Sequence, residues 1–188
     1  MINNITTSTT GDSKMTLSIR IMDEIVSSFI DYPDNESICL CVVVMGCSHK
    51  CPGCQNPLFQ NPNYNIGTRI VNVDELASEL KNRCKREHTN KITISGGDPL
   101  FKTNIEFTKE LLKQLDGYDI CIYTGYDIDY VKENNVKGFK FIKCGTFILS
   151  QKRESLKDDD KIIFASPNQK LYNGDCNLLS QNGIYYFN

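Results

Sequence analysis

Three cysteines lie close together in the segment MGCSHKCPGCQN, residues 45–56. Cys47, Cys51 and Cys54 follow the spacing Cys-x3-Cys-x2-Cys, and no fourth cysteine completes the motif nearby. A structural zinc site needs four ligands, commonly from two cysteine pairs, and the segment offers no second pair. His49 is too close to these cysteines along the chain to be an easy fourth ligand, and we expect it to be a solvated loop side chain. The spacing therefore favours a metal group that uses three thiolates.

An iron–sulfur cluster is the interpretation that fits three thiolates. A cubane cluster normally has four thiolate ligands, so three leave one iron without a protein ligand. Such an iron can bind a small molecule, as catalytic metal sites do through an open position. Cys-x3-Cys-x2-Cys in a loop after a first β-strand is the signature of radical S-adenosylmethionine (SAM) enzymes. We therefore predict Cys47, Cys51 and Cys54 as ligands of a 4Fe–4S cluster that binds SAM.

The surrounding sequence must place this loop, and its pattern predicts an α/β fold. Short apolar, β-branched runs alternate with segments of helical spacing. Strands are expected at 37–46, 91–95, 118–124, 139–145 and 161–166, and helices at 72–87, 103–117 and within 125–135. Asn72 and either Thr103 or Asn104 are the expected helix caps. The alternation predicts βαβ units and a mostly parallel sheet.

Two further loops are expected beside the cysteine loop. They are SGGDPL after the second strand and TGY after the third, because loops that follow parallel strands gather at the carboxyl end of the sheet. Gly96 and Gly97 let the backbone approach a ligand closely, and Asp98 can accept hydrogen bonds from an ammonium group. An ordinary Gly-Gly turn before a helix is the alternative. Thr124 and Tyr126 are further candidates, although a strand-to-helix turn also uses glycine at this point.

The composition argues against several classes of protein. The net charge of −2 lacks the basic balance of a nucleic-acid-binding protein. No apolar run approaches the roughly 18 residues of a membrane span, and the N-terminus lacks a secretory signal. Nine cysteines, an odd number, favour a reducing setting over a disulfide framework. We expect a cytoplasmic protein without nucleic-acid or membrane partners, a disordered polar tail at 1–14 and a single domain at 15–188. Cys39 and Cys41, two apart in one strand, are expected to be small core residues.

Four segments together resemble one family. GCSHKCPGCQN, TISGGDPL, IYTGY and ASPNQKLY occur in the order found in the anaerobic ribonucleotide reductase activating proteins, which are radical SAM enzymes. The resemblance covers about residues 30–172. Gly53 before the third cysteine matches this family, whereas many radical SAM proteins carry an aromatic residue there. Gln55 and the pair Cys144-Gly145 depart from the family's usual residues. The implied fold is α/β, a partial, open (β/α) radical SAM barrel with a mostly parallel sheet.

The resemblance also implies how SAM would be held. Its methionyl amine and carboxylate would chelate the fourth iron, while the SGGDPL loop receives the amine. The backbone at Gly53 and Gln55 would lie along the adenine. The residues implied in SAM binding are Gly53, Cys54, Gln55, Gly96, Gly97, Asp98, Thr124 and Tyr126.

The implied reaction needs two partner proteins. A flavodoxin- or ferredoxin-type donor would supply one electron to the cluster, which would cleave SAM to methionine and a 5′-deoxyadenosyl radical. That radical would abstract hydrogen from a glycine on the large subunit of anaerobic ribonucleotide reductase, leaving a glycyl radical. The hard chemistry belongs to the cofactors, and the protein positions them.

Three alternatives remain open from the sequence. The first is an activase of another glycyl-radical enzyme, of the pyruvate formate-lyase type, although those chains are usually longer and tend to have an aromatic residue at the position of Gly53. The second is a radical SAM enzyme that acts on a small molecule. The third is a non-catalytic zinc or electron-transfer module, which bound iron and sulfide would exclude.

Overall fold

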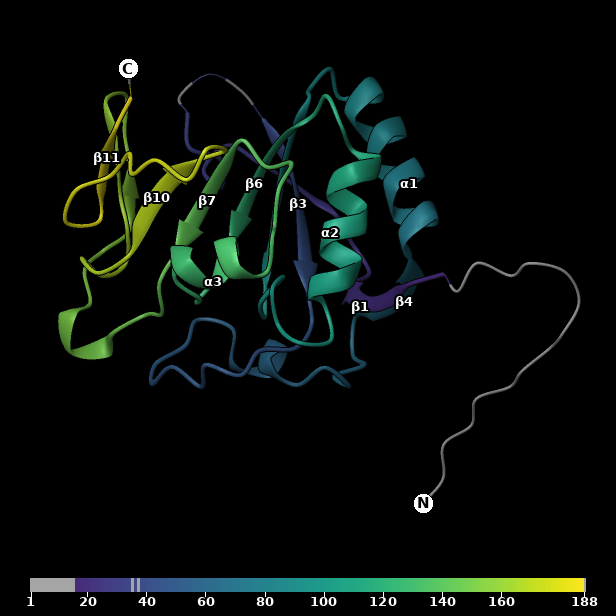
Figure 1. Cartoon of the computed structure of the whole chain (residues 1–188), viewed down its shortest axis with the longest axis horizontal. Helices are drawn as coiled ribbons and strands as arrows, with labels where there is room; N and C mark the ends of the chain where they lie inside the picture. Colours follow the sequence, from purple (N-terminus) through teal and green to yellow (C-terminus); the bar gives the residue numbers. More distant parts are fainter. Residues whose placement is uncertain (1–15, 35, 37, 188) are drawn as a thin grey trace, which may run out of the picture.

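Four parallel strands form the centre of the main sheet in the computed structural model, which describes residues 16–34, 36 and 38–187 (Figure 1). In spatial order they are β7 (Phe141–Cys144), β6 (Asp119–Tyr123), β5 (Lys91–Gly96) and β3 (Cys39–Val44). The α/β class with a mostly parallel, open sheet is confirmed, as are the strands expected at these positions. The tail expected at 1–14 lies outside the described residues, and the single domain expected at 15–188 stays a prediction.

Three helices connect these strands where the sequence predicts them. They are α1 (Val73–Arg86), α2 (Ile105–Gln114) and α3 (Ile128–Glu133). Asn72 caps α1 as expected: its side chain accepts a hydrogen bond from the Glu75 amide at 2.9 Å, and the Glu75 carboxylate accepts one from the Asn72 amide at 3.3 Å. This reciprocal capping box satisfies two amides that the helix leaves free.

Antiparallel strands extend the sheet on both sides, and the sequence pattern did not reveal them. The full order is β10-β7-β6-β5-β3-β1-β4, with β2 paired to β3. The added strands are β1 (Ser18–Met22), β2 (Val26–Ser28), β4 (Thr68–Asn72) and β10 (Lys170–Asn173). They are short and partly exposed, so their apolar pattern is weak. The two end strands, β4 and β10, do not pair with each other, and the sheet stays open.

The last predicted strand, 161–166, forms only in part and in a different sheet. It is β9 (Lys161–Ile163), the central strand of a small antiparallel sheet with β8 (Leu156–Lys157) and β11 (Ile184–Tyr186). Its pairing partners are neighbours from the C-terminal part of the chain, so the βα alternation of the main sheet does not extend to it. Figure 1 shows this part of the chain at the end of the sheet opposite to α1 and α2.

One face of the main sheet packs against the helices and forms the larger core. Alternate strand residues such as Val42, Ile94 and Ile122 join Leu80 of α1 and Leu111 of α2 in this cluster.

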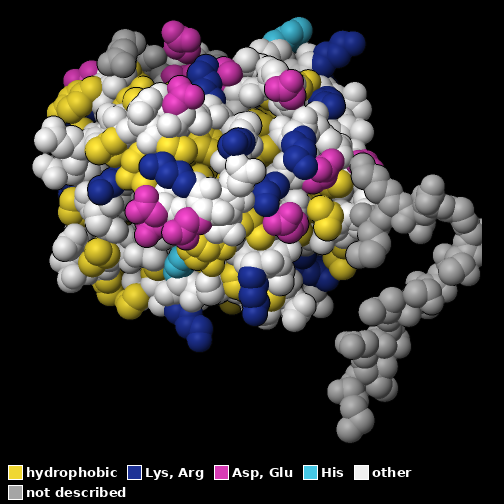
Figure 2. Space-filling view, viewed as in Figure 1, with side chains coloured by type: hydrophobic (Ala, Val, Ile, Leu, Met, Phe, Trp, Pro, Cys, Tyr) yellow, Lys and Arg dark blue, Asp and Glu magenta, His cyan; other side chains and the backbone are white. Residues whose placement is uncertain are grey.

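On the surface of the molecule drawn in Figure 2, basic and acidic side chains are interspersed. Within the described part of the chain, no helix combines the length and apolar character that crossing a membrane requires.

The opposite face of the sheet carries the intervening residues of the strands. Cys39, Cys41 and Cys121 are buried there against Tyr32. The Cys39 and Cys41 sulfurs lie 3.7 Å apart on one strand face, and neither forms a disulfide. The prediction that these two are small core residues is confirmed.

A half-buried lysine lies on this same face. The Lys143 ammonium is 4.4 Å from the centre of the Tyr123 ring and 5.6 Å from that of Phe164. It makes no hydrogen bond or ion pair with the described residues. Burial lowers the pKa of Lys143 from 10.5 to about 8. The aromatic rings therefore compensate only part of the cost of removing this charge from water.

Replacing Asn72 with alanine should destabilise the protein without disturbing its core. The loss of the capping box should lower the free energy of unfolding by about 1 kcal/mol, measured by urea denaturation. Asn82→Ala, an exposed change inside the same helix, is the matched control and should be neutral or slightly stabilising. Equal losses in both variants would show that the cap contributes nothing.

Replacing Lys143 with methionine should stabilise the protein at neutral pH. Below about pH 8 both the folded and the unfolded lysine are protonated, so the cost of burying the charge is fully present. Between about pH 8 and 10.5 the folded state releases the proton first, and this cost disappears as pH rises. Lys143→Met should therefore raise the free energy of unfolding by about 1–2 kcal/mol at pH 7, and by clearly less at pH 10. Exposed Lys137→Met is the control, and an equal gain at both pH values would contradict the account.

Candidate functional site

The three predicted loops meet at the carboxyl ends of β3, β5 and β6, as the parallel topology requires. Figure 1 shows the segment after β3 running beneath the arrowheads of the parallel strands. Backbone hydrogen bonds join the loops directly: the Gly97 amide donates to the Val44 carbonyl at 2.7 Å, and the Asp98 amide donates to the Gly46 carbonyl at 2.7 Å. The cysteine loop is therefore packed onto the SGGDPL loop by main-chain contacts.

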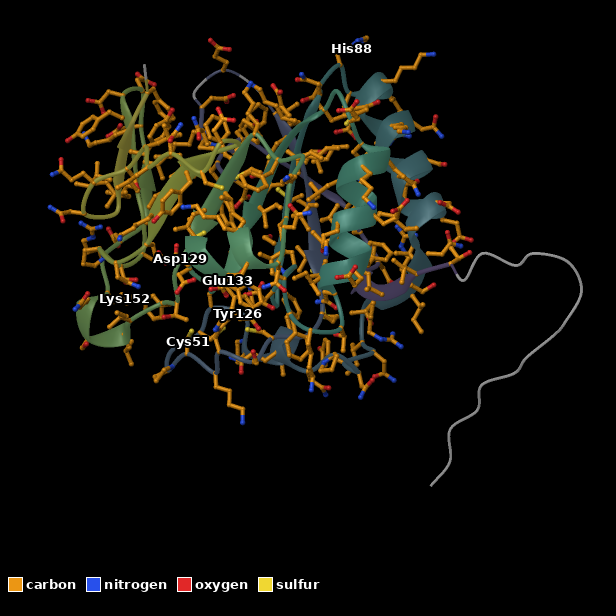
Figure 3. The ribbon with its side chains drawn as sticks, in the orientation of Figure 1. Cys51, His88, Tyr126, Asp129, Glu133 and Lys152 are labelled. Atoms are coloured by element: carbon orange, nitrogen blue, oxygen red, sulfur yellow. The ribbon has the colours of Figure 1, made fainter. Side chains whose placement is uncertain are left out.

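The three cysteines of the motif are free thiols, and each is partly exposed. The Cys54 amide donates to the Cys51 carbonyl at 3.1 Å, which closes a turn between them, and the Cys47 amide donates to the Gln60 carbonyl at 3.1 Å. Burial raises the pKa of the Cys47 thiol, and a bound metal ion would favour its thiolate form. Figure 3 shows Cys51 and Tyr126 at the end of the molecule opposite to His88. Three accessible sulfurs on one loop fit the donor set of a cluster with an open iron.

Gly96 and Gly97 are required by the packing of the protein itself. Gly96 has a φ of +114°, and a Cβ there would lie 2.6 Å from the Val44 carbonyl oxygen. A Cβ on Gly97 would lie 2.5 Å from both the Gly46 and the Phe59 carbonyl oxygens. The close approach predicted from these glycines is thus made to the end of β3 and the cysteine loop. Their contact with the SAM amine stays a prediction.

The Asp98 carboxylate is fully buried and is shared by donors from three loops. One oxygen accepts hydrogen bonds from the Leu100 amide at 2.8 Å and the Thr124 hydroxyl at 2.8 Å. The other accepts from His49 Nε2 at 2.9 Å and the Gly125 amide at 2.8 Å. The four donors occupy the acceptor positions that a carboxylate offers. Reception of the amine by the Asp98 side chain, which stays a prediction, would require one of these donors to move.

His49 is not a solvated side chain, and that prediction is wrong. Its side chain is only 14% exposed because the ring packs against Asp98 and lies edge-on to the Tyr126 ring, with 4.5 Å between ring centres. Cys47, His49 and Asp98 bring their potential ligand atoms within 4.8 Å of one another. No local pattern in the sequence signals this contact, because Asp98 lies 49 residues further along the chain.

Asn104 is a second residue whose role the sequence did not reveal. It occupies the N-cap position of α2, as predicted, but its side chain does not cap the helix. The buried amide instead donates to the Met45 carbonyl at 2.8 Å and to the Asp98 carbonyl at 2.9 Å. The start of α2 is thereby tied to both the end of β3 and the SGGDPL loop.

Thr124 and Tyr126 belong to the site, although their contact with SAM stays a prediction. The Thr124 hydroxyl donates a hydrogen bond to the Asp98 carboxylate. The Tyr126 ring stacks on Tyr130 at 3.9 Å between ring centres, and its hydroxyl lies 3.2 Å from the Ser48 hydroxyl. The TGY loop therefore supports the cysteine loop from the side of β6.

Gly53 and Gln55 lie on the outer part of the cysteine loop and are exposed. Gly53 has a φ of +71°, and a Cβ there would lie 2.8 Å from Leu149 Cδ1. The positive φ favours glycine at this turn, and the absent side chain leaves room for Leu149 of η2 (Leu149–Gln151). The prediction that Gly53 and Gln55 lie along the adenine stays a prediction.

Comparison with known proteins identifies the relatives of this chain. Residues 36–172 match the family model described as "4Fe-4S single cluster domain". The anaerobic ribonucleoside-triphosphate reductase-activating protein of Escherichia coli (strain K12) is 30% identical over 137 residues, which cover 69% of this chain and 84% of that protein. The protein of the same name from Enterobacteria phage T4 is 29% identical over 146 residues, 76% of this chain and 88% of the relative.

A third relative of the same name, from Haemophilus influenzae, is 31% identical over 121 residues, 60% of this chain and 76% of that protein. The matched region contains all three cysteines and the loops that pack around them. The match to the cluster-domain model agrees with the three free thiols at the carboxyl end of the sheet. This chain belongs to the family of anaerobic ribonucleoside-triphosphate reductase-activating proteins.

Proposed function

We propose that this chain is a radical SAM enzyme that activates an anaerobic ribonucleotide reductase by generating a glycyl radical on its large subunit. The observation that carries the proposal is the loop of three free, accessible thiols at the carboxyl end of a parallel sheet. The relatives that match most of this chain are named as activating proteins of anaerobic ribonucleoside-triphosphate reductase. A flavodoxin- or ferredoxin-type protein is the proposed electron donor.

The cluster would be held by Cys47, Cys51 and Cys54, and its fourth iron would bind SAM. When bound, the two cofactors supply the one-electron chemistry that removes a hydrogen atom from glycine. The backbone of Gly96 and Gly97 is proposed to receive the SAM amine, since the Asp98 carboxylate already has four donors. The chain thus contributes thiolate ligands, backbone acceptors and a fixed loop arrangement.

A polypeptide substrate suits the open end of the sheet. Leu58 lies in η1 (Pro57–Gln60), directly after the motif, and its side chain is 57% exposed. Leu149, which packs beside Gly53, is 49% exposed. Both side chains are available to contact a partner protein that approaches the cysteine loop. This observation favours a protein substrate over a small molecule.

The proposal is tested by electron paramagnetic resonance. Anaerobically reconstituted protein is mixed with SAM, a reductant and the large subunit of an anaerobic ribonucleotide reductase. We expect a glycyl-radical signal on the reductase, and none when SAM is omitted. A signal that forms on pyruvate formate-lyase and not on the reductase would replace this proposal with the alternative activase.

Removal of one cluster ligand provides the matched variant. Cys51→Ala should abolish SAM cleavage and most of the iron–sulfur absorbance, because two thiolates cannot hold the cluster, while far-ultraviolet circular dichroism stays unchanged. Cys176→Ser, outside the loop and also a partly exposed free thiol, should retain both. Wild-type iron content in Cys51→Ala would refute the ligand assignment.

Gly97→Ala should weaken cluster binding and SAM binding together. The added Cβ collides with the Gly46 and Phe59 carbonyls, so the cysteine loop must move. We expect about tenfold weaker SAM binding, equivalent to about 1.4 kcal/mol, and reduced iron content per chain. Gly117→Ala, where the φ of +87° strains an added side chain but no atom lies within 4 Å of the Cβ, controls for backbone strain away from the site and should keep normal iron content. A Gly97→Ala protein with full iron content and normal SAM affinity would contradict this packing role.

A further inference from the structure

We propose that His49 is a positioning residue for the cluster loop, which it fastens to Asp98 so that the His49 backbone amide points at the Cys47 sulfur. The inference rests on the proposed cluster site and concerns what sets that site's geometry and reduction potential. His49 itself ligates no iron in this account. Its ring affects the cluster indirectly, because it fixes the position of the main chain of the loop.

The ring of His49 is held on two sides. Its Nε2 donates to Asp98 Oδ2 at 2.9 Å, and the Asp98 side chain is only 1% exposed. The edge-on Tyr126 ring, 4.5 Å away between centres, limits rotation about the side-chain bonds. A charge-assisted hydrogen bond to a buried carboxylate is stronger than one exposed to water. This contact therefore fixes where the middle of the cysteine loop lies.

Gly125 leaves the space that the histidine ring occupies. The three atoms nearest to a Cβ built on Gly125 all belong to His49, and Nε2 would lie 2.6 Å away. The Gly125 backbone is not in the left-handed region, so alanine is compatible with its dihedral angles. The His49 ring thus explains why residue 125 has no side chain. Adding a methyl group there, in Gly125→Ala, should displace the ring.

The backbone of His49 contacts a predicted cluster ligand. Its amide donates to Cys47 Sγ at 3.5 Å. Lys50, the next residue, has a φ of +50°, so the chain turns sharply just after this contact. Hydrogen bonds to cluster sulfurs favour the reduced form and raise the reduction potential. Loss of the ring contact should let the loop relax, weaken this hydrogen bond and make the cluster harder to reduce.

The experiment compares four proteins, wild type, His49→Ala, His49→Gln and His88→Asn. Glutamine can present an amide donor near the position of Nε2, whereas alanine cannot. His88 is exposed at the opposite end of the molecule (Figure 3) and has a φ of +52°, which asparagine tolerates, so it provides the matched control. Two quantities are measured: amide hydrogen exchange of residues 47–56 in the metal-free protein, and the midpoint potential of the reconstituted cluster.

We expect amide exchange in the loop to become at least tenfold faster in His49→Ala. The ratio of reduced to oxidised cluster at a fixed donor ratio should fall about tenfold, which corresponds to a potential lower by about 59 mV. His49→Gln should recover both quantities to within about twofold of wild type, and His88→Asn should change neither. A purely structural histidine would alter stability without moving the potential.

A double-mutant cycle with Gly125→Ala tests whether the position of the His49 ring controls the loop exchange and the cluster potential. Alone, Gly125→Ala should reproduce the loss seen in His49→Ala, because the methyl group displaces the ring. In the His49→Ala background the same change should have no further effect, since the ring is absent. Additive effects, or wild-type exchange and potential in His49→Ala, would overturn the inference. If the wild-type protein binds no cluster, the proposed function fails, and the exchange measurement on the metal-free protein still decides whether His49 fastens the loop.

Discussion

The arrangement of the site depends on one buried carboxylate, that of Asp98. A charge removed from water must be matched by hydrogen-bond donors, or its burial is prohibitively unfavourable. The donors here come from the loops after β3, β5 and β6. Satisfying this single group therefore fixes the relative positions of three segments that are distant in the sequence. Contacts among the protein's own residues therefore hold the three loops in place.

Close backbone contact reinforces what the carboxylate arranges. Gly46, Gly96 and Gly97 remove side chains where the loops touch, and the amides of Gly97 and Asp98 donate across the junction. Asn104 adds donors from the start of α2. Catalytic groups on loops work best when a rigid scaffold holds them. Rigid support also suits a site whose open end must admit part of another protein.

The sequence predicted the central fold well because its signals are local. Buried parallel strands give continuous apolar runs, and α1 carries both its apolar spacing and its cap, Asn72. The strands β1 and β4 escaped prediction because they are short and only partly buried, so their apolar pattern is weak. Spacing also singled out the three cysteines as predicted ligands, since they are neighbours in the chain. It could not place His49, whose position is decided by a contact with Asp98 from another loop.

Three thiolates should leave one iron of the cluster open for SAM. Electron–nuclear double resonance on the reduced cluster, with SAM carrying nitrogen-15 in its methionyl amine, measures this most directly. An amine bound to that iron predicts a nitrogen coupling large enough to require a direct bond between the two atoms. A reduced cluster that binds labelled SAM without any such coupling would contradict the account.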